Sequence, residues 1–374
     1  MRRVECPICL TMLDWEQEPL VTIGRDLTPA PFALPPDASP ALTRILLSTA
    51  YRTCKGGGHY LPATYGEQDV QRITIAMIGN TAAGKSHLLA AMIGQFMRGV
   101  RLRQLDLQVE PLDLRIHKDY VDKVVTPFLD RRELLKRTDI GNVQITDAFL
   151  VTNLAASRRY AVTFFDVSGE QLARAGADQK EFLGAVDAVI FVVDPQAIRG
   201  LALSSATAAP PVTAPQARPA QEPGVTVPES GSEGDPSFDV ALKLLRLARA
   251  EPAEFLYIPA AIIVAKADLL RRSDPLVDRW LRADADEDLD LSTVEEESGD
   301  VFTYLYAHGA DRWLEPAQQF IWSTLHFASA AGTAPRANHF PEASFRPRRV
   351  IKPLLALLAA RGVIDQSALG RASQ

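Results

Sequence analysis

From about residue 71 onward, two patterns of apolar residues alternate along the chain. Short continuous apolar runs over residues 72–78, 186–194 and 259–265 predict buried strands. Between these runs, apolar residues recur at the spacing of one helix face. After the first strand they are Leu88, Leu89, Met92, Ile93 and Phe96. This alternation predicts an α/β fold with a mostly parallel sheet that helices cover on both faces.

Further elements follow from the same patterns. Residues 148–154 and 160–166 predict a hairpin, because the polar sequence Ser157, Arg158, Arg159 separates them. Helical spacing predicts helices over residues 119–135, 301–314 and 350–361 and from Val240 onward, and a last strand should end near Phe327.

Three segments depart from these patterns. Residues 202–236 contain seven prolines and no aromatic residue, which predicts a disordered insertion. The strongly acidic residues 284–297 predict a solvated loop. Residues 1–66 contain all three cysteines and many Pro and Gly residues. We therefore divide the chain into a small N-terminal module, residues 1–66, and an α/β domain, residues 67–374.

Composition excludes several classes of protein. The net charge of −6 argues against a polycation that binds nucleic acid, so no nucleic-acid partner is expected. No run of about 20 apolar residues is present, so no membrane span is expected. Three cysteines are too few and too odd in number for a disulfide framework, which predicts a cytoplasmic protein.

The loop after the first strand carries a complete phosphate-binding motif, G-x-x-x-x-G-K-[ST]. Its glycines allow backbone angles that turn N–H groups toward phosphate oxygens, and the following helix adds its positive end. Lys85 would contact the β- and γ-phosphates, and Ser86 would ligate magnesium. The predicted nucleotide-binding residues here are Gly79, Asn80, Thr81, Ala82, Ala83, Gly84, Lys85, Ser86 and His87.

Three later motifs also stand at predicted strand ends, where ligands bind in open α/β sheets. The first is Asp166-Val167-Ser168-Gly169, and the second is Lys266-Ala267-Asp268. The third is Ser329-Ala330. The Asp268 carboxylate can accept two hydrogen bonds from guanine, whereas adenine would leave it unpaired at a cost of roughly 1–3 kcal/mol.

In this order the four motifs resemble those of Ras-like, translation-factor-related P-loop GTPases, over roughly residues 71–362. Within that class, Asp166 followed by Gly169-Glu170, Pro195 and the helix after Arg348-Arg349 are similar to the bacterial "double-GTPase" group, some of whose members have a Cys-rich N-terminus.

The resemblance assigns roles to residues. Asp166 would bind magnesium through water, and the Gly169 N–H would contact the γ-phosphate. Lys266 would lie along the base, and the Ser329-Ala330 backbone would contact the guanine oxygen. Ala265 departs from the usual Asn or Thr, which removes one polar contact.

A switch threonine that ligates magnesium is expected before the hairpin. Thr138 is preferred over Thr146, which fits a strand equally well. Glu170 stands where Ras-like enzymes place a water-orienting Gln. We therefore expect slow hydrolysis of GTP to GDP unless a partner assists. Lys85, Thr138 and Glu170 are the candidate catalytic residues.

The cysteines predict a structural zinc site. Cys6 and Cys9 form one Cys-x-x-Cys knuckle, and Cys54 with His59 completes a Cys3His ligand set. Thiols without a metal remain the alternative.

The sequence thus predicts a GTP-binding switch that uses magnesium and is read by a protein effector or activating partner. The alternatives are a nucleotide-binding scaffold with little hydrolysis and an ATP-using P-loop enzyme.

Overall fold

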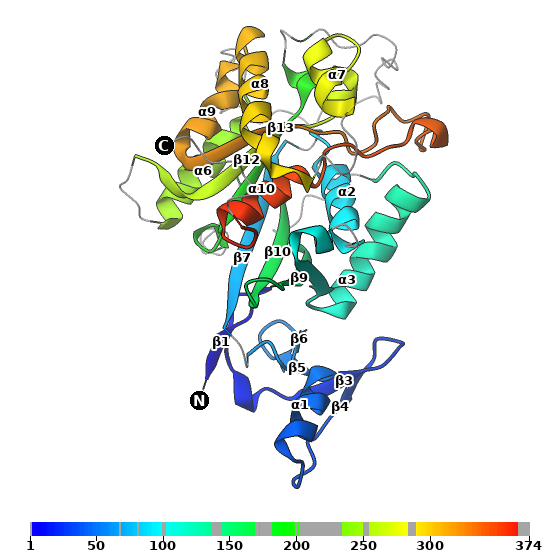
Figure 1. Cartoon of the computed structure of the whole chain (residues 1–374), viewed down its shortest axis with the longest axis vertical. Helices are drawn as coiled ribbons and strands as arrows, with labels where there is room; N and C mark the ends of the chain where they lie inside the picture. The colour runs from blue at the N-terminus through cyan, green and yellow to red at the C-terminus, as the bar shows by residue number, and fades with distance from the viewer. Residues whose placement is uncertain are drawn as a thin grey trace, which may run out of the picture.

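A computed structural model gives the fold of the chain. It describes residues 2–66, 69–80, 82–98, 102–136, 144–168, 172, 182–198, 201, 234–249, 254–282 and 289–365. Within these ranges the predicted α/β architecture is confirmed (Figure 1).

A seven-stranded sheet forms the centre of the molecule, in the order β13-β12-β11-β7-β10-β9-β8. The five strands from β13 to β10 pair in parallel, and β9 and β8 add antiparallel pairs at the other side. The strands are β7 (Val70–Gly79), β8 (Leu107–Pro111), β9 (Gln144–Asn153), β10 (Arg158–Ser168), β11 (Ala188–Val193), β12 (Leu256–Val264) and β13 (Phe320–Phe327). The predicted hairpin is β9–β10.

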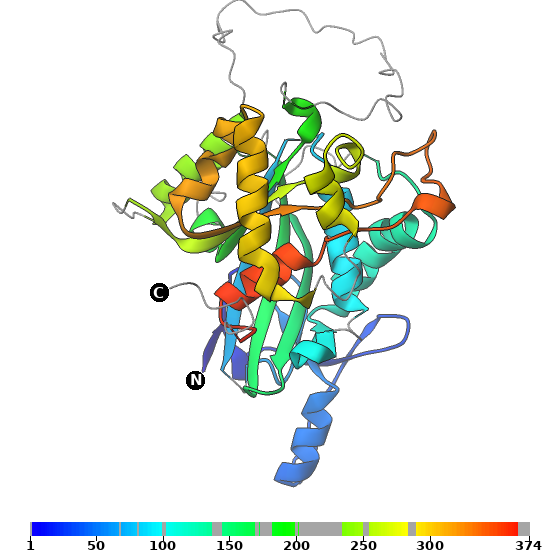
Figure 2. The same ribbon diagram turned by 45° about the horizontal axis from the view of Figure 1, so that its top comes forward.

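Helices cover both faces of this sheet (Figures 1 and 2). One face packs on α2 (Lys85–Met97), α10 (Lys352–Ala360) and the π-helix η3 (Val121–Asp130), which continues α3 (Leu114–Tyr120). The other face packs on α6 (Pro236–Arg249), α7 (Pro275–Arg282), α8 (Val294–Ala307) and α9 (Asp311–Gln319). Short 3-10 turns are η1 (Trp15–Gln17), η2 (Leu102–Leu105), η4 (Pro195–Ala197), η6 (Ala267–Leu269), η8 (Leu291–Thr293) and η9 (Glu342–Ser344).

The N-terminal module is small, and it completes its core on the central sheet. Its elements are β1 (Arg3–Glu5), β2 (Met12–Asp14), β3 (Leu20–Ile23), β4 (Pro29–Pro31), α1 (Pro40–Ser48), β5 (Tyr51–Cys54) and β6 (His59–Pro62). Cys6, Trp15 and Leu61 share one cluster with Leu150 of β9 and Ala161 of β10. Thr163 of β10 also donates a hydrogen bond to the Pro7 carbonyl, 3.2 Å away. The module is therefore attached through buried contacts.

Two helix predictions are wrong at their boundaries. The helix expected over residues 119–135 begins at Leu114, because the Asp113 side chain accepts hydrogen bonds from the Arg115 and Ile116 amides and caps it. It ends at Asp130 as a π-helix. The helix expected over residues 301–314 is two helices, α8 and α9, separated by a turn at Gly309, which has φ +68°.

The acidic segment is also corrected. Residues 284–297 are not a loop throughout, because α8 begins at Val294. Glu295, Glu296 and Glu297 occupy its first turn, where carboxylates stabilise the positive end of a helix. In the proposed insertion, residues 202–233 lie outside the described part of the chain, and Pro236 already belongs to α6.

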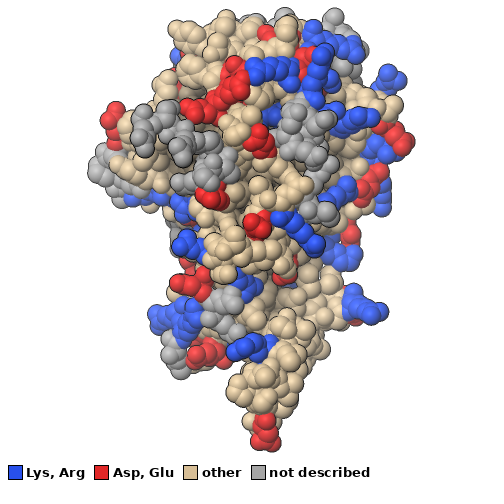
Figure 3. All heavy atoms as spheres, in the orientation of Figure 1, with Lys and Arg blue, Asp and Glu red and all other residues tan. Residues whose placement is uncertain are grey.

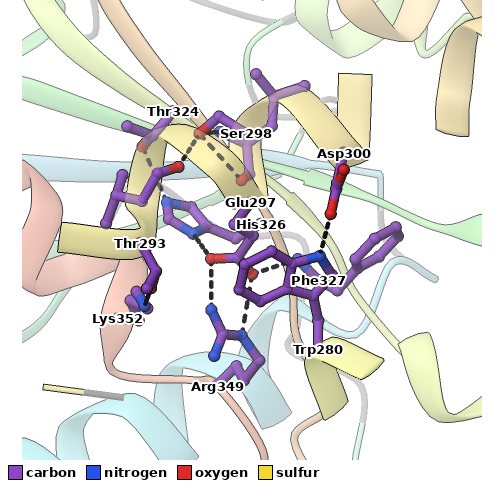
Figure 4. Close-up of polar contacts among 12 residues, drawn as sticks. Trp280, Thr293, Glu297, Ser298, Asp300, Thr324, His326, Phe327, Arg349 and Lys352 are labelled. Atoms are coloured by element: carbon purple, nitrogen blue, oxygen red, sulfur yellow. Dashed lines mark hydrogen bonds and ion pairs between the residues drawn. The ribbon is translucent and has the colours of Figure 1, made fainter. Parts of the chain in front are cut away.

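Glu297 is fully buried in a network that joins α8, β13 and the chain before α10 (Figure 4). Arg349 donates to both carboxylate oxygens through Nε at 3.0 Å and Nη2 at 2.6 Å. His326 Nδ1 lies 2.9 Å from Glu297 Oε2, and its Nε2 lies 3.0 Å from Thr324 Oγ1. Burial alone would raise the pKa of Glu297, but His326 and Arg349 lower that pKa to about 2. The buried carboxylate is therefore ionised.

We predict that Glu297→Ala lowers the free energy of unfolding by about 3–5 kcal/mol, because it leaves the Arg349 charge buried without its partner. The neighbouring Glu296, half exposed and paired with the exposed Arg279, provides the matched control. Glu296→Ala should change stability by less than about 1 kcal/mol in urea denaturation. Equal losses in the two variants would contradict the role given to Glu297.

The same network predicts a pH effect. The pKa of Glu297 is lower in the folded chain than its ordinary value of 4.5. Its contribution to stability is therefore complete above about pH 4.5 and is lost as the pH falls toward about 2. Urea midpoints measured across this range should fall more steeply for the wild type than for Glu297→Gln.

Candidate functional site

The loop between β7 and α2 carries the G-x-x-x-x-G-K-[ST] residues at the carboxyl edge of the sheet. Gly84 precedes the helix with φ +86°, a left-handed angle that glycine adopts without strain. Lys85 is buried, and its Nζ donates to the carbonyls of Gly79 and Asn80, at 2.9 Å each. The loop thus folds around the lysine ammonium group.

Ser86 and Asp166 meet beside this loop. Ser86 Oγ donates to Asp166 Oδ2 at 3.1 Å, although the two residues are 80 positions apart. Burial raises the pKa of Asp166, against the opposing effect of Lys85. Asp166 Oδ1 is buried and finds no hydrogen-bond partner among the described residues. A hydroxyl beside an unsatisfied carboxylate oxygen is a donor set that suits Mg²⁺.

Lys266, on the loop after β12, connects that loop to the loop between β7 and α2. Its backbone has φ +49°, and its Nζ donates to Ala82 O at 2.8 Å. The same ammonium group contacts Asp194 Oδ2 at 2.8 Å and Gln196 Oε1 at 3.0 Å. Asp194 is buried and was missed by the sequence analysis, although Asp194-Pro195 directly follows a strand.

Asp268, on the same loop after β12, lies beside Ser329 on the loop after β13. Ser329 Oγ donates to Asp268 Oδ1 and accepts a hydrogen bond from the Gly332 amide at 2.8 Å. Burial raises the pKa of Asp268, and the Ser329 hydrogen bond opposes this effect. The Ala265 amide donates a hydrogen bond to the Val193 carbonyl at 3.0 Å, and the Ala265 side chain adds no polar contact.

Asp235 is a second residue that the sequence analysis missed. Its Oδ2 accepts a hydrogen bond from the Asn80 amide at 3.0 Å, and its Oδ1 accepts one from the Ser237 amide. It therefore joins the start of α6 to the Gly79–Ser86 loop. An aspartate next to Pro236 and Ser237 predicts a helix cap, but nothing in the sequence predicts its contact with Asn80.

His87 directs its side chain into the core. Its Nε2 accepts a hydrogen bond from the Leu135 amide at 3.1 Å. Burial, together with the nearby Lys266 charge, lowers the pKa of His87 to about 4. The ring is therefore neutral and can act as an acceptor.

Several predicted site residues lie outside the described part of the chain: Thr81, Thr138, Gly169 and Glu170. The alternative switch residue, Thr146, belongs to β9. The structure therefore brings together Lys85, Ser86, Asp166, Lys266, Asp268 and Ser329 at one edge of the sheet.

An open cleft of about 1290 Å³ adjoins Asp268, between α7 and residues 332–348. Six arginines and three aspartates line it. Figure 3 shows Lys and Arg side chains gathered on this upper right part of the molecule, around α7. An overall acidic chain thus presents a basic surface beside the predicted base site.

The Cys and His residues of the N-terminal module form one cluster. Cys6, Cys9, Cys54 and His59 offer ligand atoms that all lie within 4.8 Å of one another. Cys6 Sγ is 3.6 Å from His59 Nδ1, and Cys9 Sγ is 3.6 Å from Cys54 Sγ. Tetrahedral zinc bonds of about 2.0–2.3 Å require separations close to these. The cluster can therefore bind a structural metal such as zinc.

Comparisons with protein-family models and with curated proteins find no match to this chain. Among the described residues, no helix is both long and apolar enough to cross a membrane.

We predict about one zinc ion per purified chain, measured by elemental analysis. Cys54→Ser should lose the metal and unfold the module, because ligand binding and folding are coupled in such small cores. His339→Ala changes an exposed histidine remote from the cluster and should retain the metal. A folded wild-type module without any metal would contradict this assignment.

Proposed function

We propose that the chain is a GTP-binding switch that hydrolyses GTP to GDP and phosphate with Mg²⁺. The observation that best supports this function is the Lys266 ammonium group, which contacts the Ala82 carbonyl in the phosphate loop while its chain neighbour Asp268 lies beside Ser329. One short segment would thereby lie between a phosphate site and a base site. A mononucleotide would fit that arrangement.

The phosphates would displace contacts that the loop makes with itself. Lys85 now donates to two loop carbonyls, and the same ammonium group would turn to the β- and γ-phosphates. Loop amides and the start of α2 would contribute further hydrogen bonds and positive potential. Asp235 would hold the beginning of the loop through the Asn80 amide.

Magnesium would bind between Ser86 and Asp166. The Ser86 hydroxyl would be a direct ligand, and Asp166 would act through water. Binding would also relieve the unpartnered Asp166 Oδ1. Thr138 would complete the site from the switch segment. Mg²⁺ would supply positive charge that stabilises the transferring phosphoryl group.

Guanine would be selected by Asp268, whose carboxylate would accept hydrogen bonds from N1–H and the 2-amino group. Ser329 already holds this carboxylate in place. The Lys266 stem would lie along the base, and the Ser329-Ala330 backbone would face the guanine oxygen. Ala265 provides no side-chain hydrogen bond, which is expected to weaken base affinity.

These roles are those that the resemblance to Ras-like P-loop GTPases assigns, and we propose that the chain belongs with them, in the double-GTPase group. Glu170 cannot donate a hydrogen bond to the γ-phosphate when ionised, so a protein partner would supply the missing assistance. A nucleotide-binding scaffold with little hydrolysis is the second candidate. Glu170 favours this candidate too, because an ionised glutamate cannot donate that hydrogen bond.

Guanine selectivity is tested by titrating labelled GTP and ATP against the wild type and Asp268→Ala. The wild type should prefer GTP, and the variant should lose roughly tenfold or more in GTP affinity, because it removes two hydrogen bonds to the base. Asp274→Ala, which removes a partly buried carboxylate that lines the same cleft and accepts the Leu276 amide, is the nearby control. Equal affinity of the wild type for both nucleotides would refute the GTPase proposal in favour of an ATP-using enzyme.

Hydrolysis is tested under single turnover. The isolated chain should turn over at or below about 10⁻⁴ s⁻¹, the unassisted rate of such switches. Glu170→Gln should raise this rate, because an amide can both orient water and donate to phosphate. Rapid wild-type hydrolysis that Glu170→Ala abolishes would instead make Glu170 the water-orienting group.

A further inference from the structure

The open cleft between α7 and residues 332–348 has a positively charged lining, on the part of the surface where Figure 3 shows Lys and Arg side chains gathered. Three of its six arginines come from the chain around α7 and three from the facing segment. Against the three aspartates of the lining, they leave an excess of three positive charges. The whole chain, by contrast, has a net charge of −6. The arginines are Arg271, Arg272, Arg282, Arg336, Arg346 and Arg348.

One aspartate of the cleft already shows how these arginines bind a carboxylate. Asp278 accepts a hydrogen bond from Arg271 Nε at 2.7 Å and forms an ion pair with Arg282 Nη2 at 2.5 Å. The other two aspartates form their hydrogen bonds elsewhere, with the Ser329 hydroxyl and with the Leu276 amide. Asp278 therefore occupies only two of the six guanidinium groups.

Three of the arginines have no partner among the described residues. The side chains of Arg272, Arg336 and Arg346 are exposed and form no ion pair or hydrogen bond within that part of the chain. The backbone on the facing segment is nevertheless held in place. The Arg346 amide donates to the Ala331 carbonyl at 2.8 Å, and the Arg336 amide donates to the His339 carbonyl at 2.7 Å. The cleft thus presents charges on both of its sides, where several anionic groups spaced along one ligand would meet them.

The residue types of the lining indicate which class of anion fits. Among the described residues that line the cleft, every cation is an arginine and none is a lysine. The planar guanidinium group matches a carboxylate through two parallel hydrogen bonds. No aromatic ring belongs to this lining, whereas sites for single-stranded nucleic acid use such rings to stack bases. At about 1290 Å³ the cleft also exceeds the roughly 300–1000 Å³ of small-molecule sites, so it suits a length of peptide.

We propose that this cleft is a docking site for an acidic peptide segment of a protein partner, whose Asp and Glu side chains pair with Arg272, Arg336 and Arg346. The segment would lie between α7 and residues 332–348, beside Asp268. This inference goes beyond the proposed GTPase function and does not depend on it. Binding is therefore measured without nucleotide.

The test is the fluorescence anisotropy of labelled octaglutamate, titrated with the purified full-length chain at low ionic strength. Arg272→Ala and Arg346→Ala should each weaken binding by about threefold to fivefold, because each removes one exposed ion pair to the peptide. The double variant should lose more than either. Arg44→Ala makes the same change of net charge on α1, which Figure 1 shows at the opposite end of the molecule from α7, and should stay within about twofold.

Asp278→Asn provides a change of opposite sign. It removes the carboxylate that holds Arg271 and Arg282, so octaglutamate should bind about threefold more tightly or better, a gain that a damaged fold would not produce. Failure of the wild type to bind octaglutamate would overturn the proposal, and so would equal losses in Arg272→Ala, Arg346→Ala and Arg44→Ala. Pyrophosphate or an oligothymidylate of equal length that bound as tightly, through the same arginines, would assign the cleft to another class of ligand and also overturn it.

Discussion

The buried Glu297–Arg349 pair is the interaction on which the candidate base site depends. It joins the first turn of α8 to the chain that enters α10, and Glu297 Oε1 also accepts the Phe327 amide at the end of β13. Ser329 follows two residues later. A buried ion pair costs desolvation and adds little net stability over an apolar contact. Its geometry, however, is strict, because each oxygen has a defined donor. The pair therefore fixes where β13 ends and where the loop that carries Ser329 begins.

Much of the architecture was predictable because its signals are local. Continuous apolar runs identified β7, β11 and β12, and the spacing from Gly79 to Ser86 identified a strand–loop–helix unit. The misses are long-range polar contacts. Glu297 stands in an acidic run and resembles a surface residue, since its partner is 52 positions away. The sequence around Asp194 and Asp235 likewise gives no sign of their partners. Only in the folded chain does Asp194 contact Lys266, and Asp235 accept the Asn80 amide.

For the N-terminal module, the sequence predicts the candidate metal ligands but not the contacts that attach the module to the rest of the chain. The cysteine spacing was sufficient to choose four ligand candidates, and the structure brings their donor atoms together. Composition could not reveal how the module attaches. The Tyr60 amide donates to the buried Asp113, and Arg115 lies over the Tyr60 ring at 4.2 Å. Since Asp113 also caps α3, the residue next to the candidate ligand His59 is linked directly to the helix that continues into η3.

The π-helical form of η3 has a consequence for the length of this chain. A π-helix bonds each amide to the carbonyl five residues back, so it accommodates one more residue per turn than an α-helix. Removing a single residue from Val121–Asp130 would allow ordinary α-helical bonding and would lose few hydrogen bonds. An α-helix turns further per residue than a π-helix, so the change of pitch and the loss of the residue would have opposite effects on the direction of the chain beyond Asp130. The Leu135 amide, which donates to His87, follows shortly after, so the form of this helix bears directly on that contact.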